Sequence, residues 1–466
     1  MSRETAIATA LAAFDGGAFK DRLASLVAIP STSQDPAFAP DVQRYLGQAI
    51  TPWLTAMGFE TTIHPNPKPG FGPILTASRI EDPALPTILT YGHGDTVRGL
   101  DEQWEPGLTP WVMTERGDRW YGRGTADNKG QHAIVLTALE AVLATRGHLG
   151  FNVKMVLEMS EERGSQGLRE FVAGHAALLA ADALIASDGP RMTPETPTIF
   201  TGTRGIWQFN LVLETRPGGV HSGNWGGMTI DPAIVMAHAI ASIADRHGKI
   251  LVRDWLPGQG DHAGIPASVR DVLKGCEMQS EESATVNPEW GEPGLTSAEK
   301  VYAWTSFIVL AMVSGKPDAP LNAVAPDARA TCHLRYTVDT DPDTFEAALR
   351  RHLDEAGFPE IRIEAEGVRM TASRTDPANP WVGHVQASMA RSLNKPVQIV
   401  PNGGGGLPGD VFVDHLGVPL VWIPLSYNGC KQHGPNEHLL IPAAREGMAA
   451  YAGIWWDLGE STPKRS

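Results

Sequence analysis

The sequence predicts an α/β protein whose mixed, mostly parallel sheet, flanked by helices, is interrupted by a smaller inserted domain. Short apolar runs alternate with helical patterns up to about residue 202 and again after residue 376, which is typical of a doubly wound sheet. Residues 203–375 instead follow the order strand, helix, strand, strand, helix, strand, the ferredoxin-like β-α-β-β-α-β arrangement. We therefore predict one domain built from residues 1–202 and 376–466, with residues 203–375 inserted into it.

The elements of the first segment follow from local patterns. Residues 38–57 carry apolar side chains at helical spacing, and Gly58 stands where a helix C-cap belongs. Beyond this helix, β-rich runs alternate with helical ones. We predict strands at 87–91, 151–159 and 183–186, and helices at 129–145 and 165–179.

The inserted segment and the last segment are assigned in the same way. Asp231-Pro232 begins a helix that Gly248 ends, and Gly357 closes a second helix. Residues 251–300 are rich in Gly and Pro, and we expect an irregular insertion there. The remaining predictions are strands at 205–214, 305–312, 328–338, 360–366, 397–400 and 418–424, and helices at 342–355 and 443–458.

Composition excludes several classes of function. The 466 residues carry 38 Lys+Arg against 53 Asp+Glu, a formal charge of −15, which argues against nucleic acid or an anionic membrane surface as a partner. Three widely spaced cysteines encode neither a disulfide framework nor a thiolate zinc cluster. The N-terminus lacks the apolar core of a signal peptide, and no apolar run is long enough to span a bilayer. We expect a cytoplasmic protein.

Several metal-binding side chains follow the predicted strands. His93 lies in GHGDTV with Asp95 two residues on, and Glu161-Glu162 follow the strand at 151–159. Asp188 follows the next strand, and His433 follows the strand at 418–424. Each residue alone has an ordinary structural explanation. Because parallel strands end at one edge of a sheet, we expect the group to converge there.

The expected ligand set favours two divalent ions. Two histidines with carboxylates and no cysteine suit zinc first, with manganese or cobalt as alternatives. Asp127, in GRGTADNKG before a helix, has the ordinary explanation of an N-cap. Two ions bridged by Asp127 would use all five ligands and leave Glu161 free to take a proton from a bridging water.

The ordered motifs GHGDTV, GRGTADNKG, MSEERGS, SDG, HSG and a late His followed by NE resemble a known family. It is the dinuclear-zinc metallopeptidase family of aminoacylases, succinyl-diaminopimelate desuccinylases, glutamate carboxypeptidases and carnosine-type dipeptidases. The TRG…HSG…GG stretch most resembles the cytosolic dipeptidase branch. The resemblance implies that the inserted domain is a lid and dimerisation domain. It further implies a homodimer.

The resemblance also implies roles for single residues. One metal would be held by His93, Asp127 and Asp188, and the other by Asp127, Glu162 and His433. Asp95 would orient His93, Glu161 would be the general base, and the Asp127-Asn128 peptide would be cis. The residues implied to contact substrate are His221, which acts across the dimer interface, and Arg335, Asn322 and Gly406.

Arg335 would grip a substrate carboxylate at the end of the pattern NxxxPxxxxxxxxR, which begins at Asn322. Two departures concern the substrate end. Gly406 stands where many relatives place Ser or Thr, and the loop before His433 reads SYNGCKQ instead of an acidic run.

The predicted function is a two-metal hydrolase that cleaves a peptide bond next to a free carboxylate, as a dipeptidase or short-peptide carboxypeptidase. One alternative is an N-acyl amino acid deacylase or another non-peptide amidohydrolase. A second is a non-catalytic metal-binding homologue, although Glu161 and all five ligands are present. The GxGxxG pattern at residues 404–409 would suggest a dinucleotide enzyme, but Pro408 interrupts it and no helix start is obvious after it.

Overall fold

The computed structural model describes residues 2–258, 264–276, 278, 285–365 and 369–463. The chain divides into two compact units. Unit 1 contains the described residues of Met1–Gly202, Thr375–Val400 and Leu407–Ser466, and unit 2 contains those of Thr203–Arg374 and Pro401–Gly406.

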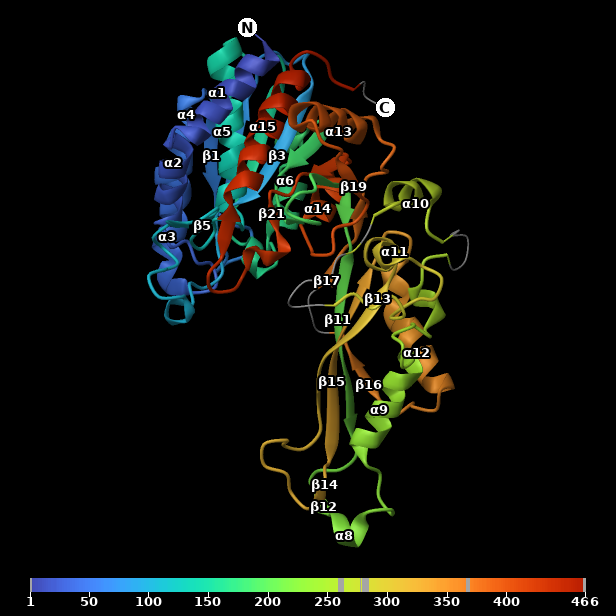
Figure 1. The fold of residues 1–466 in the computed structure, drawn as a ribbon. Helices are drawn as coiled ribbons and strands as arrows, with labels where there is room; N and C mark the ends of the chain where they lie inside the picture. Colours follow the sequence, from blue (N-terminus) through green and yellow to red (C-terminus); the bar gives the residue numbers. More distant parts are fainter. Residues whose placement is uncertain (1, 259–263, 277, 279–284, 366–368, 464–466) are drawn as a thin grey trace. The chain divides into compact units, whose positions relative to one another are not determined.

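Unit 1 is built on an eight-stranded sheet (Figure 1). In sheet order the strands are β1 (Glu60–His64), β2 (Ile74–Arg79), β6 (Asn152–Glu158), β3 (Thr87–His93), β7 (Ala183–Ala186), β20 (Leu420–Trp422), β9 (Thr198–Phe200) and β19 (Gln398–Val400). The four neighbours β6, β3, β7 and β20 are parallel, whereas β1–β2, β2–β6 and β20–β9 pair antiparallel. The predicted mixed, mostly parallel sheet is therefore confirmed.

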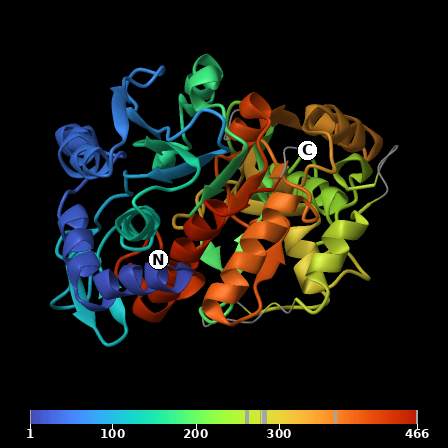
Figure 2. The ribbon, with the colours of Figure 1, turned by 90° about the horizontal axis from the view of Figure 1, so that it is seen from above.

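Helices flank this sheet. They are α1 (Arg3–Asp15), α2 (Ala18–Val27), α3 (Ala39–Arg44), α4 (Thr51–Ala56), α5 (Lys129–Arg146), α6 (Leu168–Gly174), α7 (Ala176–Leu179), α13 (Pro380–Leu393), α14 (Gly409–Leu416) and α15 (Ile441–Leu458). The helices α1, α5 and α15 pack against one another, although α1 and α15 lie at opposite ends of the sequence (Figure 2). Most residues of α5 and α15 are buried, as expected of helices covered on several sides.

Two predicted helices of unit 1 are interrupted. The run at 38–57 is helical, but a π-helix, η2 (Tyr45–Ile50), separates α3 from α4. Pro52, in the first turn of α4, has no N–H to donate to residue 48, which disfavours a regular α-helix across this junction. The helix expected at 165–179 is divided at His175 into α6 and α7.

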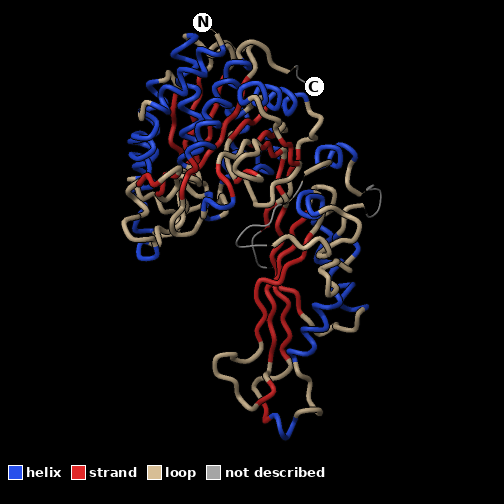
Figure 3. Tube along the Cα trace, viewed as in Figure 1, coloured by secondary structure: helices blue, strands red, loops and turns tan. Residues whose placement is uncertain are grey.

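Unit 2 has the predicted β-α-β-β-α-β order. Its elements are β11 (Gly205–Glu214), α9 (Pro232–Ile243), β13 (Ser306–Val313), β15 (Asp327–Tyr336), α12 (Phe345–Glu355) and β16 (Arg362–Glu364). The strands pair antiparallel in the order β13-β15-β11-β16, which leaves one side of β13 unpaired within the described chain (Figure 3).

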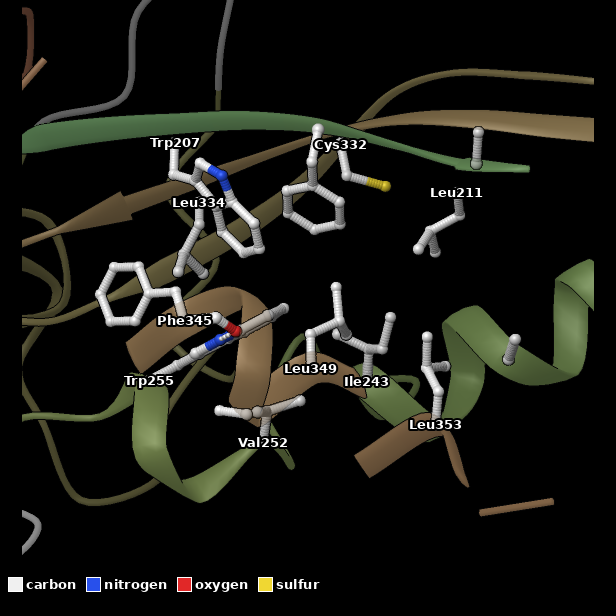
Figure 4. Packing of buried hydrophobic residues seen from close by; sticks show 14 of the residues in the cluster. Trp207, Leu211, Ile243, Val252, Trp255, Cys332, Leu334, Phe345, Leu349 and Leu353 are labelled. Atoms are coloured by element: carbon white, nitrogen blue, oxygen red, sulfur yellow. Dashed lines mark hydrogen bonds between the residues drawn. The ribbon is translucent and has the colours of Figure 1, made fainter. Parts of the chain in front are cut away.

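The two faces of this second sheet differ. Side chains alternate along β11, so Trp207 and Leu211 enter the core that α9 and α12 cover (Figure 4). Leu334 and Cys332 of β15 enter the same core. The intervening positions of both strands therefore lie on the opposite face of the sheet.

The expectation of an irregular stretch at 251–300 is partly wrong. It contains α10 (Ala267–Leu273) and α11 (Ser297–Tyr302), and Thr296 and Glu299 form a capping box at the start of α11. The other short elements are η1 (Pro36–Phe38), η3 (Asp101–Gln103), β4 (Thr114–Arg116), β5 (Arg119–Tyr121), η4 (Glu161–Arg163), β8 (Pro190–Arg191), β10 (Gly202–Thr203), β12 (Val220–His221), α8 (Ser222–Trp225), η5 (Arg253–Trp255), β14 (Ala323–Val324), η6 (Pro342–Thr344), β17 (Arg369–Met370), β18 (Ser373–Arg374), β21 (Ser426–Tyr427), η7 (Asn428–Cys430) and β22 (His438–Leu440).

Cys276, Cys332 and Cys430 form no disulfide with one another. Within the described ranges, no helix combines the length and the apolar character that crossing a bilayer requires. The cytoplasmic location stays a prediction.

Candidate metal centre

The carboxyl ends of four parallel strands carry most of the candidate ligands. His93 is the last residue of β3, and Glu161 and Glu162 begin η4 shortly after β6 ends. Asp188 follows β7, and His433 lies in the loop that leads away from β20. The parallel register of these strands brings the loops to one edge of the sheet, as predicted.

Asp127 enters the same site from the loop before α5. Its peptide bond to Asn128 is cis, as the resemblance implies. The loop is held by the buried carboxylate of Glu437, which accepts backbone N–H groups of Gly124 at 3.0 Å, Ala126 at 3.0 Å and Asp127 at 3.1 Å. The guanidinium of Arg123 donates to the same carboxylate at 2.7 Å. Glu437 therefore fixes the backbone that presents Asp127.

One group of ligands gathers around His93. Its Nε2 lies 2.9 Å from Asp127 Oδ1 and 3.6 Å from Asp188 Oδ2. Asp188 Oδ2 is buried and has no hydrogen-bond partner within the described ranges, while Oδ1 accepts the backbone N–H of Gly189 at 2.6 Å. One ligand atom from each of His93, Asp127 and Asp188 lies within 4.8 Å of the others, the spacing expected around one ion.

A second group gathers around His433 and shares Asp127. His433 Nε2 lies 3.2 Å from Asp127 Oδ2 and 3.0 Å from Glu162 Oε2, so Asp127 presents one oxygen to each group. Gln432 also donates to Asp127 Oδ2 at 3.3 Å. The second group again fits within 4.8 Å. The two groups contain the five residues that the resemblance implies.

Asp95 connects His93 to the loop that carries both glutamates. The His93 ring atom Nδ1 lies 3.1 Å from the Asp95 carbonyl and 3.5 Å from Asp95 Oδ1. The Asp95 carboxylate accepts the backbone N–H groups of Glu161 and Glu162, both at 3.2 Å. Asp95 therefore orients the imidazole and the glutamate loop together. Glu161 belongs to neither ligand group.

The electrostatics of the cluster favour a bound cation. Burial and the neighbouring charge of Asp127 raise the pKa of both Glu162 and Asp188 to about 7. Burial also acts to raise the pKa of Asp127, but hydrogen bonds from His433 and His93 outweigh it and hold that pKa well below its usual range. Hydrogen bonds to Asp127 and Glu162 raise the pKa of His433 to about 11. Crowded carboxylates and an unpartnered Asp188 oxygen suit divalent cations bound by nitrogen and oxygen ligands.

The implied substrate residues belong to unit 2. His221 is exposed, and the backbone N–H of Ser222 donates to the Asn322 carbonyl at 3.0 Å, so His221 and Asn322 are neighbours. β15 begins at residue 327, and Arg335 lies near its other end, roughly 26 Å away along the strand at about 3.3 Å per residue. A Cβ added to Gly406 would approach Ile206 of β11, whose register partner is Arg335. Gly406 is therefore near Arg335, whereas His221 and Asn322 are distant from it.

Sequence reasoning gave no role to Glu437 or Gln432. Glu437 stands in the NE motif after the late histidine, and this motif was the available signal. Gln432 stands in the altered SYNGCKQ loop, which the sequence alone assigns to the substrate end. Its contact with Asp127 places this alteration beside the ligand cluster instead.

Comparisons with known proteins agree with this geometry. Residues 89–457 match Peptidase family M20/M25/M40. A Beta-Ala-His dipeptidase of Mus musculus is 33% identical over 409 residues, covering 83% of this chain and 80% of the relative. A Cys-Gly metallodipeptidase DUG1 of Candida albicans is 30% identical and covers 93% of each chain.

Solved structures share the fold. The dipeptidase Dug1p from Saccharomyces cerevisiae aligns with a TM-score of 0.79 at 20% identity, over 99% of this chain and 100% of the other. Human carnosine dipeptidase 1 aligns with a TM-score of 0.74 at 21% identity, over 98% and 100%. The long sequence match and the relative above 30% identity show that this chain belongs to Peptidase family M20/M25/M40 and is a metal-dependent hydrolase.

Proposed function

We propose that this chain is a two-metal dipeptidase that cleaves a peptide bond next to a free carboxylate. The observation that carries the proposal is the pair of ligand groups that share Asp127, with Glu161 half-buried next to Glu162 and part of neither group. A shared carboxylate with one oxygen toward each group is the arrangement expected of a two-metal hydrolase.

His93, Asp127 and Asp188 would hold one ion, and Asp127, Glu162 and His433 the other. Zinc is the first choice because the set combines imidazoles with carboxylates, and manganese and cobalt accept similar ligands. When bound, such ions supply Lewis acidity toward the peptide carbonyl and make a water nucleophilic near neutral pH.

Within the chain's own machinery, Glu161 is the proposed general base. Its carboxylate accepts the proton of the attacking water and later delivers it to the leaving amine. Asp95 binds the backbone N–H of Glu161, and it thereby sets where the base stands relative to His93. Asp95 is a positioning residue in this scheme, because it acts through Glu161 and His93.

Dipeptides are favoured over the other substrate classes by the relatives. The curated relatives that match most of this chain are named for dipeptidase activity on β-Ala-His, on Cys-Gly and on cysteinylglycine S-conjugates. An acetylornithine deacetylase also matches, but over 33% of this chain. The non-catalytic alternative is disfavoured because the proposed base and all five ligands are retained.

Residues of unit 2, the proposed lid, would also contact the substrate. Arg335 would bind the free carboxylate, and His221 would polarise the scissile carbonyl. His221 Nδ1 accepts the backbone N–H of Gly223 at 3.1 Å, so the proton of the neutral ring lies on Nε2 and can be donated. His221 lies beyond the residue 327 end of β15, and about 26 Å of this strand separates that end from Arg335. One small substrate therefore cannot touch both residues of one chain.

A homodimer resolves this separation, because His221 of one copy can meet a substrate held by Arg335 of the other. The exposed side chains of the edge strand β13 support a homodimer. Five apolar side chains there are at least one-third exposed: Ile308, Val309, Leu310, Met312 and Val313. An exposed apolar edge favours association unless it is covered, and a second copy of the same edge covers both symmetrically.

The test combines metal content with a substrate panel. The purified protein should hold close to two equivalents of metal, and Asp127→Ala should lose both. Loaded with zinc, manganese or cobalt, it should release amine from Ala-Ala, Cys-Gly or β-Ala-His faster than from N-acetyl amino acids. Glu161→Gln is the matched inactive control.

Each of the other outcomes would support a different function for this protein or a different metal content. Cleavage of N-acyl amino acids alone would establish the amidohydrolase alternative. Tight metal binding with no turnover of either class would establish the non-catalytic one, and one equivalent of metal with full activity would overturn the two-metal assignment.

A further inference from the structure

A second arginine lies beside Arg335 on the polar face of unit 2. Arg335 is the register partner of Ile206 on β11 and of Ser306 on β13, and directly paired side chains share a face. Arg204, two residues before Ile206, points to that face and donates through Nη1 to Ser306 Oγ at 3.0 Å. Arg204 and Arg335 therefore lie on the same face of the sheet, Arg204 hydrogen-bonded to Ser306 and Arg335 paired with Ser306 in the strand register.

Neither arginine is neutralised within the described chain. No carboxylate among the described residues forms an ion pair with Arg204 or Arg335. Arg204 is 8% exposed, and its buried Nε has no hydrogen-bond partner among the described residues. Arg335 is half-buried, and its buried Nη1 likewise has no hydrogen-bond partner in the described part of the chain. Burial, reinforced by repulsion from Arg335, lowers the pKa of Arg204 to about 10, yet it stays charged at neutral pH.

Burying two positive charges side by side costs free energy unless anions neutralise them. The proposed function accounts for one carboxylate at Arg335, the α-carboxylate of the amine-side residue. One carboxylate neutralises one guanidinium and leaves a second positive charge beside it. A second carboxylate within reach of Arg204 would complete the balance. When the α-carboxylate is bound at Arg335, the side chain of the same C-terminal residue is the nearest part of a dipeptide that can supply it.

We propose that Arg204 and Arg335 form a two-arginine subsite that selects dipeptides with a C-terminal glutamate or aspartate. This inference rests on the proposed dipeptidase function and names the substrate class of the same site. Arg204 is the specificity residue. A planar guanidinium can bind a carboxylate through two parallel N–H groups, which lysine cannot reproduce.

The test compares Ala-Glu with Ala-Gln, which differ in one side-chain group of nearly equal shape. We expect kcat/KM for Ala-Glu to exceed that for Ala-Gln by about tenfold or more, equivalent to about 1.4 kcal/mol. Arg204→Gln should reduce this ratio to near one. Arg204→Lys should keep an intermediate ratio, which separates loss of charge from loss of fold.

Arg329→Gln is the matched control. Arg329 lies on the same strand and face as Arg335, six residues away, but it is ion-paired with Glu364 at 3.1 Å. Its substitution should leave the Ala-Glu to Ala-Gln ratio unchanged. Calorimetric titration with L-glutamate and L-glutamine provides a second readout that needs no turnover, and Arg204→Gln should weaken glutamate binding selectively.

A ratio near one in the unaltered enzyme, or an equal loss for both dipeptides in Arg204→Gln, would overturn the inference while dipeptidase activity stands. Failure to cleave any dipeptide would overturn the proposed function instead. In that case the calorimetric titration would still test the two-arginine subsite. Tighter binding of L-glutamate than of L-glutamine would support the subsite, and equal binding would overturn it.

Discussion

The Glu437 carboxylate accepts the backbone N–H of Asp127 at 3.1 Å, 310 residues apart in sequence. The same carboxylate accepts N–H groups of Gly124 and Ala126 and pairs with Arg123. His433 lies four residues before Glu437 on the same loop. One buried side chain therefore couples the loop of the shared ligand Asp127 to the loop of His433.

Glu437→Gln should weaken metal binding, although Glu437 belongs to neither ligand group. A carboxamide offers one acceptor oxygen, and its NH₂ group would face backbone donors that now meet a carboxylate. Residues that orient ligands typically contribute about 10–100-fold to metal affinity. Chelator competition measures this loss, and Glu115→Gln, an exposed glutamate paired with Lys20, is the control. Unchanged affinity in a folded Glu437→Gln protein would contradict the coupling.

Glu161 and Glu162 should respond differently to the same substitution. Glu161→Gln should retain metal and lower turnover by about 10²–10⁴-fold, the scale of a positioned general base. Glu162→Gln removes a ligand oxygen that lies 3.0 Å from His433 Nε2, so it should lose metal from that group. Metal analysis beside kcat separates the two, and the opposite pattern would exchange the two roles.

Mixed dimers should recover activity. His221→Ala and Glu161→Gln chains are each expected to be inactive as homodimers. If His221 serves the partner's site, a heterodimer contains one site with both residues intact and should show up to about half of the activity per dimer. Activity after subunit exchange, with heterodimers verified by mass, measures this. Verified heterodimers without activity would mean that His221 does not act across the interface.

Asp457 should stabilise unit 1 except in acid. Its carboxylate is bound by Arg3 of α1 and by Ser388 and Arg391 of α13. Burial acts to raise the pKa of Asp457, but these hydrogen bonds outweigh it and lower that pKa below its usual range. Because the folded pKa is below the unfolded one, the contribution is full above about pH 4 and is lost as the pH falls through the folded value.

Asp457→Asn should therefore lower the free energy of unfolding at pH 7 by on the order of 2 kcal/mol, and by less near pH 3. Urea unfolding at both pH values measures the difference. Asp15→Asn, an exposed carboxylate paired with Arg445, is the control and should change stability little at either pH. An equal loss for Asp457→Asn at both pH values would contradict the assignment.

The strand-end chemistry was predictable because it depends on local patterns. The runs before His93, Glu161 and Asp188 are short, apolar and bounded by turn residues, and parallel strands then place their following loops together. The order of the inserted elements was predictable for the same reason.

Pairings between distant segments were not predictable in this way. Nothing near Glu437 indicates which backbone N–H groups it binds, since its partners precede it by more than 300 residues. The π-helix at Tyr45–Ile50 and the helices α10 and α11 depend on single Pro and Thr positions that a periodic pattern does not register. The sequence shows Arg204 only as part of the TRG motif, and its place on the same face as Arg335 follows from the pairing of Ile206 with Arg335.

The position of β20 has a consequence for synthesis on the ribosome. This strand lies between β7 and β9, yet more than 200 residues separate it from either in sequence. Until residue 422 has emerged, the nascent chain exposes the apolar edge of β7, and contacts over such separations form slowly. The inserted segment does not depend on β20, so it can fold while unit 1 remains incomplete. Stalled or truncated chains that lack β20 should consequently be prone to aggregate through the unpaired edge of β7.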